Sequence, residues 1–191
     1  MTANNALLED IARHISGSST PTLKPGYCGL STSYNVPDKT SILEGELARV
    51  VPSSWTRTGS IISINSLIGA ATGNCLETTI NTVTSATVFT VNSTTGLAIG
   101  DRVQITLASF ANRKEERKIG NIVGTTITLT EALSATPSST NPFKQMISRV
   151  QLAHGSATAT LNSGSAFSIA PYKAIKTSSN TIYFEHIVNI I

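Results

Sequence analysis

The stretch TVFTVNSTTGLAIGDRVQITL, residues 87–107, decides the fold class of this chain. Over residues 103–107 apolar side chains alternate with polar ones, so an extended strand would have one buried and one solvated face. The polar segment 92–96 ends in glycine and predicts a turn, and a second tight turn is expected at Gly100. The stretch therefore predicts two β-strands and their turns, and it holds no residue that catalysis requires.

A second stretch, KIGNIVGTTITLTEAL, repeats this pattern over residues 118–133. Gly124 and Thr125 are expected at the turn of a hairpin, with alternating residues on either side. Together the two stretches predict a small β-barrel-like domain over residues 78–142, inserted into another domain.

The composition favours a mainly β chain. Only 13% of the 191 residues are charged, while 40% are hydrophobic. Ser, Thr, Asn and Gly supply the polarity, which suits solvated strand faces and turns. The two cysteines have no Cys-x-x-Cys spacing, so we expect reduced, buried thiols and no zinc site or disulfide framework.

The net charge of +3 comes without a basic stripe or interleaved aromatic residues, so we expect no nucleic-acid partner. The N-terminus lacks the basic and apolar regions of a leader, and no apolar run is long enough to span a bilayer. We therefore expect a soluble protein made in a cytoplasm, with no membrane partner.

The N-terminal sequence NALLEDIARHISG predicts a short amphipathic helix, followed by a linker, over residues 1–20. Such a helix is marginal alone and must bury its apolar face on the same subunit or on a neighbour. The chain also stops on two isoleucines that need cover. The residues predicted to form an assembly interface are Leu7, Leu8, Ile11, Ile15, Ile190 and Ile191.

The remaining residues, 21–77 and 143–191, are predicted to form a β-sandwich body. Its expected strands include residues 27–33 and the final alternating segment after Asn180. Trp55 is the only tryptophan, and core packing is its better-supported role, with a glycan contact as the alternative.

The pattern of titratable residues does not predict an enzyme, a metal site or a cofactor. His14, His154 and His186 stand in separate segments, and no nucleophile elbow or phosphate-binding loop is present. A carboxylate pair for glycoside cleavage could come from Asp38, Glu44 and Glu46, although we expect these acids to lie in surface loops. The charged segment NRKEERK, residues 112–118, is predicted to be a solvated loop between strands, with a contact patch for an acidic partner as the alternative.

Several short motifs resemble a family of small bacteriophage virion proteins that are tail fibre-like or capsid decoration-like. They are NALLEDIARHISG, TPTLKPGYCGLSTS, ELARVVPSSW with SIISIN, and the late ATLNSGSAFSIA. The resemblance covers about the first 70 and the last 40 residues. The middle of the chain departs from it and looks like a small β-domain of a kind seen in many phage structural proteins.

The resemblance implies a virion structural protein that assembles with other virion proteins, in the tail or at the baseplate, and forms homo-oligomers. One alternative is a capsid decoration (cement) protein that stabilises the head. A second alternative is a host glycan-binding module. The sequence does not distinguish a head from a tail location.

Overall fold

The computed structural model describes residues 2–3, 26–35, 43–59, 61–153 and 157–189. These residues form a mainly β fold in which every strand pairing is antiparallel. The mainly β class predicted from the sequence is confirmed. The described part of the chain contains no helix, and so none that is long and apolar enough to cross a membrane.

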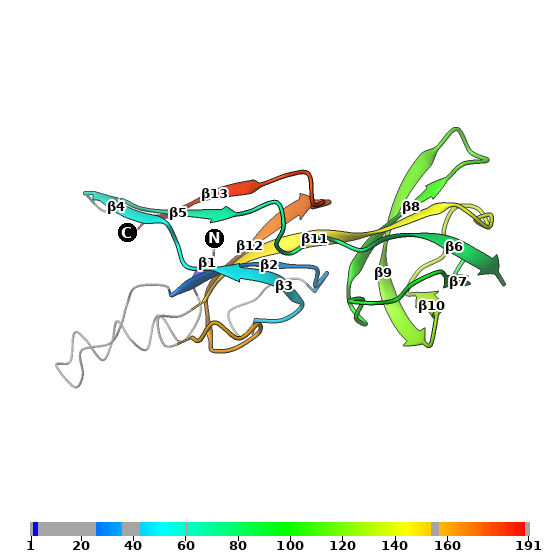
Figure 1. The fold of residues 1–191 in the computed structure, drawn as a ribbon, viewed down its shortest axis with the longest axis horizontal. Helices are drawn as coiled ribbons and strands as arrows, with labels where there is room; N and C mark the ends of the chain where they lie inside the picture. The colour runs from blue at the N-terminus through cyan, green and yellow to red at the C-terminus, as the bar shows by residue number, and fades with distance from the viewer. Residues whose placement is uncertain (1, 4–25, 36–42, 60, 154–156, 190–191) are drawn as a thin grey trace.

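The first lobe consists of two sheets that face each other (Figure 1). The large sheet holds β1 (Thr2–Ala3), β2 (Tyr27–Ser31), β3 (Glu46–Val50), the second half of β11 (Pro142–Ala153) and β12 (Ala166–Ala174). The three-stranded sheet holds β4 (Ser54–Thr58), β5 (Ile61–Ile68) and β13 (Ile182–Asn189), in the order β13-β5-β4.

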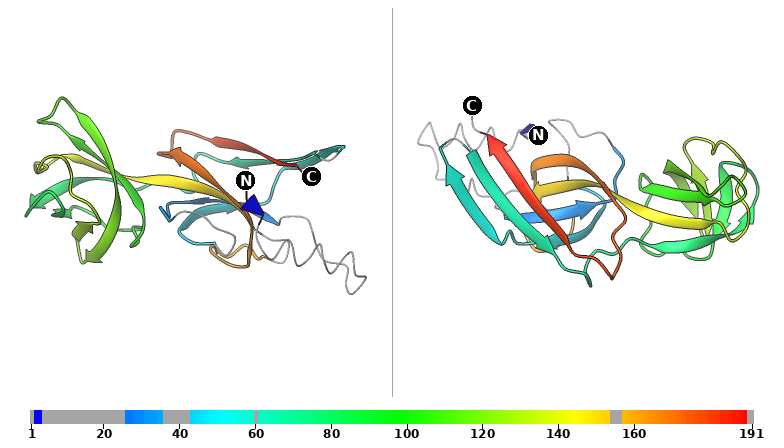
Figure 2. Two further views of the ribbon diagram at one scale, coloured as in Figure 1. Left: turned by 180° about the vertical axis from the view of Figure 1, so that it is seen from behind. Right: turned by 90° about the horizontal axis from the view of Figure 1, so that it is seen from above.

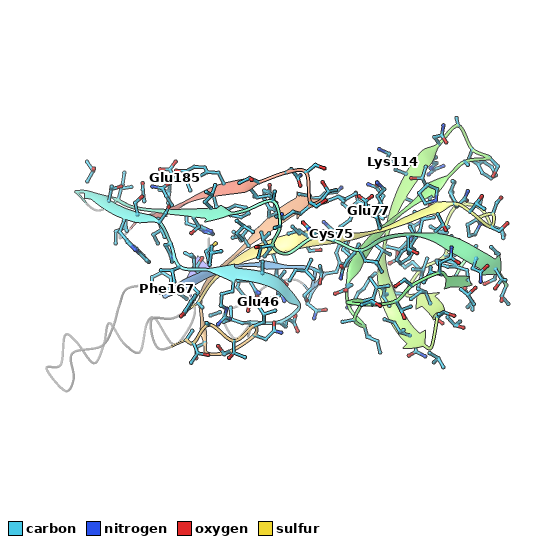
Figure 3. The ribbon with its side chains drawn as sticks, viewed as in Figure 1. Glu46, Cys75, Glu77, Lys114, Phe167 and Glu185 are labelled. Atoms are coloured by element: carbon cyan, nitrogen blue, oxygen red, sulfur yellow. The ribbon has the colours of Figure 1, made fainter. Side chains whose placement is uncertain are left out.

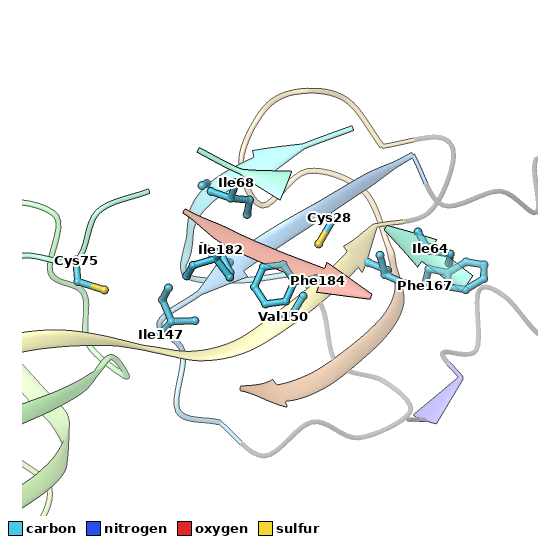
Figure 4. Close-up of a cluster of buried hydrophobic side chains, with 12 residues drawn as sticks. Cys28, Ile64, Ile68, Cys75, Ile147, Val150, Phe167, Ile182 and Phe184 are labelled. Carbon is cyan, nitrogen blue, oxygen red and sulfur yellow. The ribbon is translucent and has the colours of Figure 1, made fainter. Parts of the chain in front are cut away.

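The core of the first lobe lies between these two sheets. Figure 4 shows Cys28 and Val150 of the large sheet near Ile182 and Phe184 of the three-stranded sheet. The ring of Phe184 meets that of Tyr172 edge-on, with centroids 5.0 Å apart. Burying one such aliphatic or aromatic side chain stabilises the fold by about 1.5–3 kcal/mol, so this cluster holds the two sheets together.

The second lobe is a sheet that closes on itself. Its strands are β6 (Glu77–Val83), β7 (Val88–Val91), β8 (Arg102–Leu107), β9 (Arg113–Val123), β10 (Thr126–Leu129) and the first half of β11. β11 pairs with both β6 and β8, and the other strands pair in the order β6-β7-β10-β9-β8, so the ring has no open edge. Closure removes the unpaired backbone groups that an edge strand would expose.

The alternating residues that decided the fold class fill this ring. Val103, Ile105 and Leu107 are fully buried, whereas the residues between them are partly exposed. Phe89 and Phe143 meet edge-on across the interior, with ring centroids 6.1 Å apart. Period-two alternation therefore places one side of each strand in a dense apolar core.

Strand β11 runs through both lobes, as the two views of Figure 2 show. Residues 142–146 pair with β6 and β8, and residues 147–153 pair with β12 and β2. Strand β11 changes its pairing partners between Met146 and Ile147, so one continuous strand contributes to both cores.

A buried polar network fixes the junction between the lobes. Asp101, just before β8, accepts hydrogen bonds from the Thr32 hydroxyl at 2.5 Å and from Gln145 Nε2 at 2.7 Å. Ser33 forms an isolated β-bridge with Asp101, and the Ser148 hydroxyl donates to the Thr32 carbonyl. These partners satisfy a carboxylate that is only 2% exposed, which ties the end of β2 to the second lobe.

The loop prediction for residues 112–118 is wrong, because Arg113–Val123 is strand β9. Residues 113–118 pair in register with residues 102–107. Glu115 is buried on one face, where Arg117 and the Ser134 hydroxyl donate to it, while Lys114 points to the other face. Charges on both faces hid the alternation, yet the inner charge is satisfied by its neighbours.

Two predictions stay predictions. The helix predicted within residues 1–20 lies outside the described residues. In this range the structure describes only Thr2–Ala3, which is strand β1. The domain boundaries at residues 78 and 142 are also untested, although the second core cluster draws its buried residues from Ile80 to Phe143.

Candidate assembly surface

Four large apolar side chains lie exposed on the outward face of the three-stranded sheet. Strands β5 and β13 alternate, so that Ile64 and Phe184 point into the core while their neighbours point outward. In Figure 3, Glu185 projects from β13 away from the large sheet, on this outward face. We call the exposed apolar set the outer patch: Ile61 (43% exposed), Leu67 (53%), Tyr183 (61%) and Ile187 (53%).

The strand register groups the members of the outer patch into two pairs, with Asn65 and Glu185 between them on the same face. Leu67 of β5 lies directly opposite Tyr183 of β13. Ile187 pairs with Ser63 and is therefore a diagonal neighbour of Ile61. The Tyr183 hydroxyl donates to Asn65 Oδ1 at 2.5 Å, which fixes the ring across the sheet. The outer patch is thus a surface in which aromatic and aliphatic side chains face outward and the tyrosine ring is fixed by a hydrogen bond.

Strand β13 borders the outer patch and is an edge strand within the part of the chain that the structure describes. It pairs with β5 over residues 182–189 and with no other described strand. An edge strand presents backbone groups that another chain can pair with. The patch and this edge together have the features of a protein-protein contact.

All six residues predicted for the interface lie outside the described residues. Leu7, Leu8, Ile11 and Ile15 lie outside the described residues. Ile190 and Ile191 also lie outside them, directly after β13 in the chain. Their predicted role stays a prediction.

Trp55 lies on β4, opposite Ile64 of β5, and packs against the core of the first lobe. Its side chain is partly buried. This position gives it a packing role on the inward face of the sheet, and the glycan contact predicted as its alternative stays a prediction.

The sequence did not reveal that Cys28 and His186 meet in the core, because 158 residues separate them. Their Sγ and Nε2 atoms lie 3.7 Å apart. Burial raises the pKa of the Cys28 thiol to about 12 and lowers that of the His186 imidazole to about 4. Near neutral pH both groups are therefore uncharged, which is unlike the thiolate that a nucleophilic cysteine needs.

The expectation that Glu44 and Glu46 are surface-loop acids is wrong for Glu46, which lies in β3 and is 6% exposed. Its Oε2 accepts a hydrogen bond from Arg49 Nη2 at 2.6 Å. Burial works to raise the pKa of Glu44, but hydrogen bonds from Ser33, Asn35 and Arg149 hold it below its usual value. Both acids are thus bound by arginine, while Asp38 lies outside the described residues.

Metal ligation has no cluster to support it in the described ranges, where no group of three His, Cys, Asp or Glu side chains converges. His186 is the one histidine among them, since His14 and His154 lie outside.

The residues of the outer patch were missed by sequence reasoning, although a signal for them exists. In SIISINSLI, Ile61 and Leu67 have the opposite parity to Ile62, Ile64 and Ile68, so one strand carries apolar residues on both faces. Two facing sheets bury one face of each sheet, and the second apolar face of β5 is exposed in the described part of the chain.

Comparisons with protein-family models, with curated proteins and with solved structures find no match to the chain.

Proposed function

We propose that this chain is a structural subunit that assembles with other protein subunits through the outer patch and the β13 edge. The assembly is a bacteriophage particle, and the subunit lies in its tail fibre or at its baseplate. The motifs that resemble small virion proteins support this assignment. The same motifs support capsid decoration as the alternative.

The observation that carries the proposal is the exposure of the outer patch. Its four members are between 43% and 61% exposed, and they share one sheet face. Apolar side chains that are exposed on one sheet face are unfavourable in water and are typical of a protein interface. Tyrosine with aliphatic neighbours is also a common composition for the centre of an interface.

Strand addition at β13 would extend the same contact. A strand from a second subunit would pair with the open edge of β13, while its side chains would cover the patch beside it. Repetition of one contact in a homo-oligomer multiplies its effect, since each added subunit is held at more than one place.

In this proposal the two facing sheets are a β-sandwich body, and the closed lobe is a small barrel-like domain inserted into it. Both parts would then serve as the framework that carries the assembly contacts. The predicted N-terminal helix and the final isoleucines would add contacts to neighbouring virion proteins.

The test replaces the patch with charge in the full chain, by the double substitution Leu67→Lys and Ile187→Lys. The matched control is Ile99→Lys with Val123→Lys, because these side chains are 63% and 68% exposed in the second lobe. We expect self-association, measured by light scattering, and incorporation into particles to fall more than about tenfold for the patch variant alone. Unchanged mass and unchanged incorporation of that variant would overturn the proposal.

Location is a separate measurement. Antibody labelling of the protein on intact particles should mark the tail or baseplate. Label distributed over the head would favour the capsid decoration alternative.

A further inference from the structure

A hollow of about 500 Å³ lies where the two lobes meet. The segment after β2, the start of β8, the second half of β11 and the end of β12 line it. Its most informative residues are Tyr34, Asn35, Arg102, Arg149, Tyr172 and Lys173. The volume falls within the range of small-molecule sites in proteins, roughly 300–1,000 Å³.

One wall of the hollow holds Arg149, which is ion-paired with Glu44. Arg149 is 2% exposed, and it donates to Glu44 Oε1 at 2.5 Å and to the Ser31 hydroxyl at 3.3 Å. Lys118 lies nearby, since its Nζ donates to Asn35 Oδ1 at 2.9 Å. These contacts hold the groups in place before any ligand arrives, which lowers the entropic cost of binding.

Arg102 is the cationic side chain of the hollow whose N–H donors are unused within the described part of the chain. Its guanidinium carbon lies 4.1 Å from the centre of the Tyr34 ring, so the two groups are stacked. Arg102 forms a long ion pair with Glu116, with Nε and Oε2 4.0 Å apart, and its buried Nε atom has no hydrogen-bond partner among the described residues. A stacked arginine with free donors is suited to bind a carboxylate through two parallel hydrogen bonds.

The other walls are suited to a hydroxylated ring. Tyr34 and Tyr172 provide aromatic surface, and Ser33 and Ser148 provide hydroxyl oxygens that can accept hydrogen bonds while they donate to Glu44 and to the Thr32 carbonyl. Such a mixture of aromatic surface and a few convergent polar groups can orient a ligand with both an apolar face and hydroxyls. Glu116 pairs with Lys173 at 2.5 Å and offsets part of the positive charge, which favours a singly charged ligand over phosphate.

From this arrangement we infer that the hollow binds an acidic saccharide, in which a sugar ring carries a carboxylate. Arg102 binds the carboxylate, Lys173 adds positive charge at the rim, and a tyrosine ring contacts the sugar. The ligand therefore touches both lobes at once. This site is separate from the outer patch and does not depend on assembly.

The experiment titrates the full chain with the methyl glycosides of glucuronic acid and of sialic acid, with methyl glucoside as the neutral partner and inorganic phosphate as the plain anion. Calorimetry or saturation-transfer NMR measures binding. We expect an acidic sugar to bind about tenfold or more tightly than methyl glucoside, because a charge-assisted pair is lost in the neutral sugar.

Two variants locate the site, and a third is the control. Arg102→Met should weaken binding about tenfold or more, and Lys173→Met, whose side chain is 56% exposed, should weaken it less without affecting folding. Arg113→Met removes an equal charge from the opposite face of β9 to Glu116, where its side chain is 61% exposed, and should leave binding unchanged. The inference is overturned if neither acidic sugar binds at millimolar concentration, if phosphate binds as tightly, or if Arg102→Met and Lys173→Met both bind like the wild type.

Discussion

Thr32 and Asp101 connect the two lobes of the chain, because the Thr32 hydroxyl donates to Asp101 Oδ1 over 2.5 Å. Thr32 directly follows β2 of the first lobe, and Asp101 directly precedes β8 of the second. The carboxylate also accepts hydrogen bonds from Gln145 and from the Ala98 amide. Its protonation is therefore coupled to the geometry of the junction.

Acidification should favour the folded state through Asp101. Burial raises the pKa of its carboxyl above the ordinary 3.8, even though three hydrogen bonds work to lower it. The folded state thus binds this proton more readily, so the contribution is full below pH 3.8 and is lost as the pH rises through the folded pKa. Urea unfolding should show that the free energy of unfolding of the wild type, relative to that of Asp101→Asn, is higher at pH 4 than at pH 7. A difference that does not change with pH would contradict this.

His186 should act in the opposite direction. Burial lowers its pKa from 6.5 to about 4, so the folded state binds its proton less readily. Its contribution is full above pH 6.5 and is lost as the pH falls, by up to about 3 kcal/mol near pH 4. The free energy of unfolding of His186→Gln should therefore depend less on pH between 6.5 and 4 than that of the wild type. Equal slopes for the two proteins would show that His186 is not buried in its neutral form.

Both cysteines should resist thiol reagents until the chain unfolds. Cys28 and Cys75 are buried and are not bonded to each other, and burial raises the pKa of each thiol. With dithionitrobenzoate at pH 8 we expect almost no reaction of the native protein and reaction of both thiols in denaturant. Rapid modification of native Cys28 would disprove the core position assigned to it.

Lys176 should stabilise the fold despite burying a charge. It is fully buried, and its Nζ donates to Asn74 Oδ1 and to the carbonyls of Ala70 and Asn180, at 3.1–3.2 Å. Lys176→Met leaves these acceptors without a donor and should lower the free energy of unfolding by about 2–4 kcal/mol. Lys173→Met is the exposed control and should change it by less than about 1 kcal/mol. Similar values for the two variants in chemical denaturation would show that the buried amine contributes little.

Trp55 offers a test between packing and recognition. Because the side chain packs against the first core, Trp55→Ala should lower the free energy of unfolding by about 2–4 kcal/mol. Trp55→Phe should restore most of the loss. Wild-type stability of Trp55→Ala, together with lost binding on a glycan array, would instead support the glycan contact.

The mainly β class was predictable because local alternation encodes it. Residues 103–107 and 126–129 have the burial that their patterns indicate. The charged strand that begins at Arg113 was not predictable in this way, since its inner Glu115 is tolerated only because Arg117 and Ser134 bind it. Alternation shows which face of the strand a residue occupies, but it does not show which side chains the residue contacts on that face.

The candidate sites required contacts that are remote in sequence. The outer patch joins β5 to β13, and its apolar residues on both faces gave only a local hint. The hollow draws Tyr34, Arg102, Arg149 and Tyr172 from four separate segments. No spacing rule connects them, because antiparallel pairing and the shared strand β11 bring them together only in the folded chain.

The double membership of β11 limits how the chain can be divided. A deletion of residues 78–142 would leave Phe143 and its neighbours in β11 without the strands that they pair with and without the core that surrounds them. Transplanting residues 78–142 alone would omit the strand that seals the ring, so the exchangeable cassette must extend through Met146. Pulling the lobes apart would load a covalent backbone instead of a docked interface, and the subunit should therefore behave mechanically as a single rod.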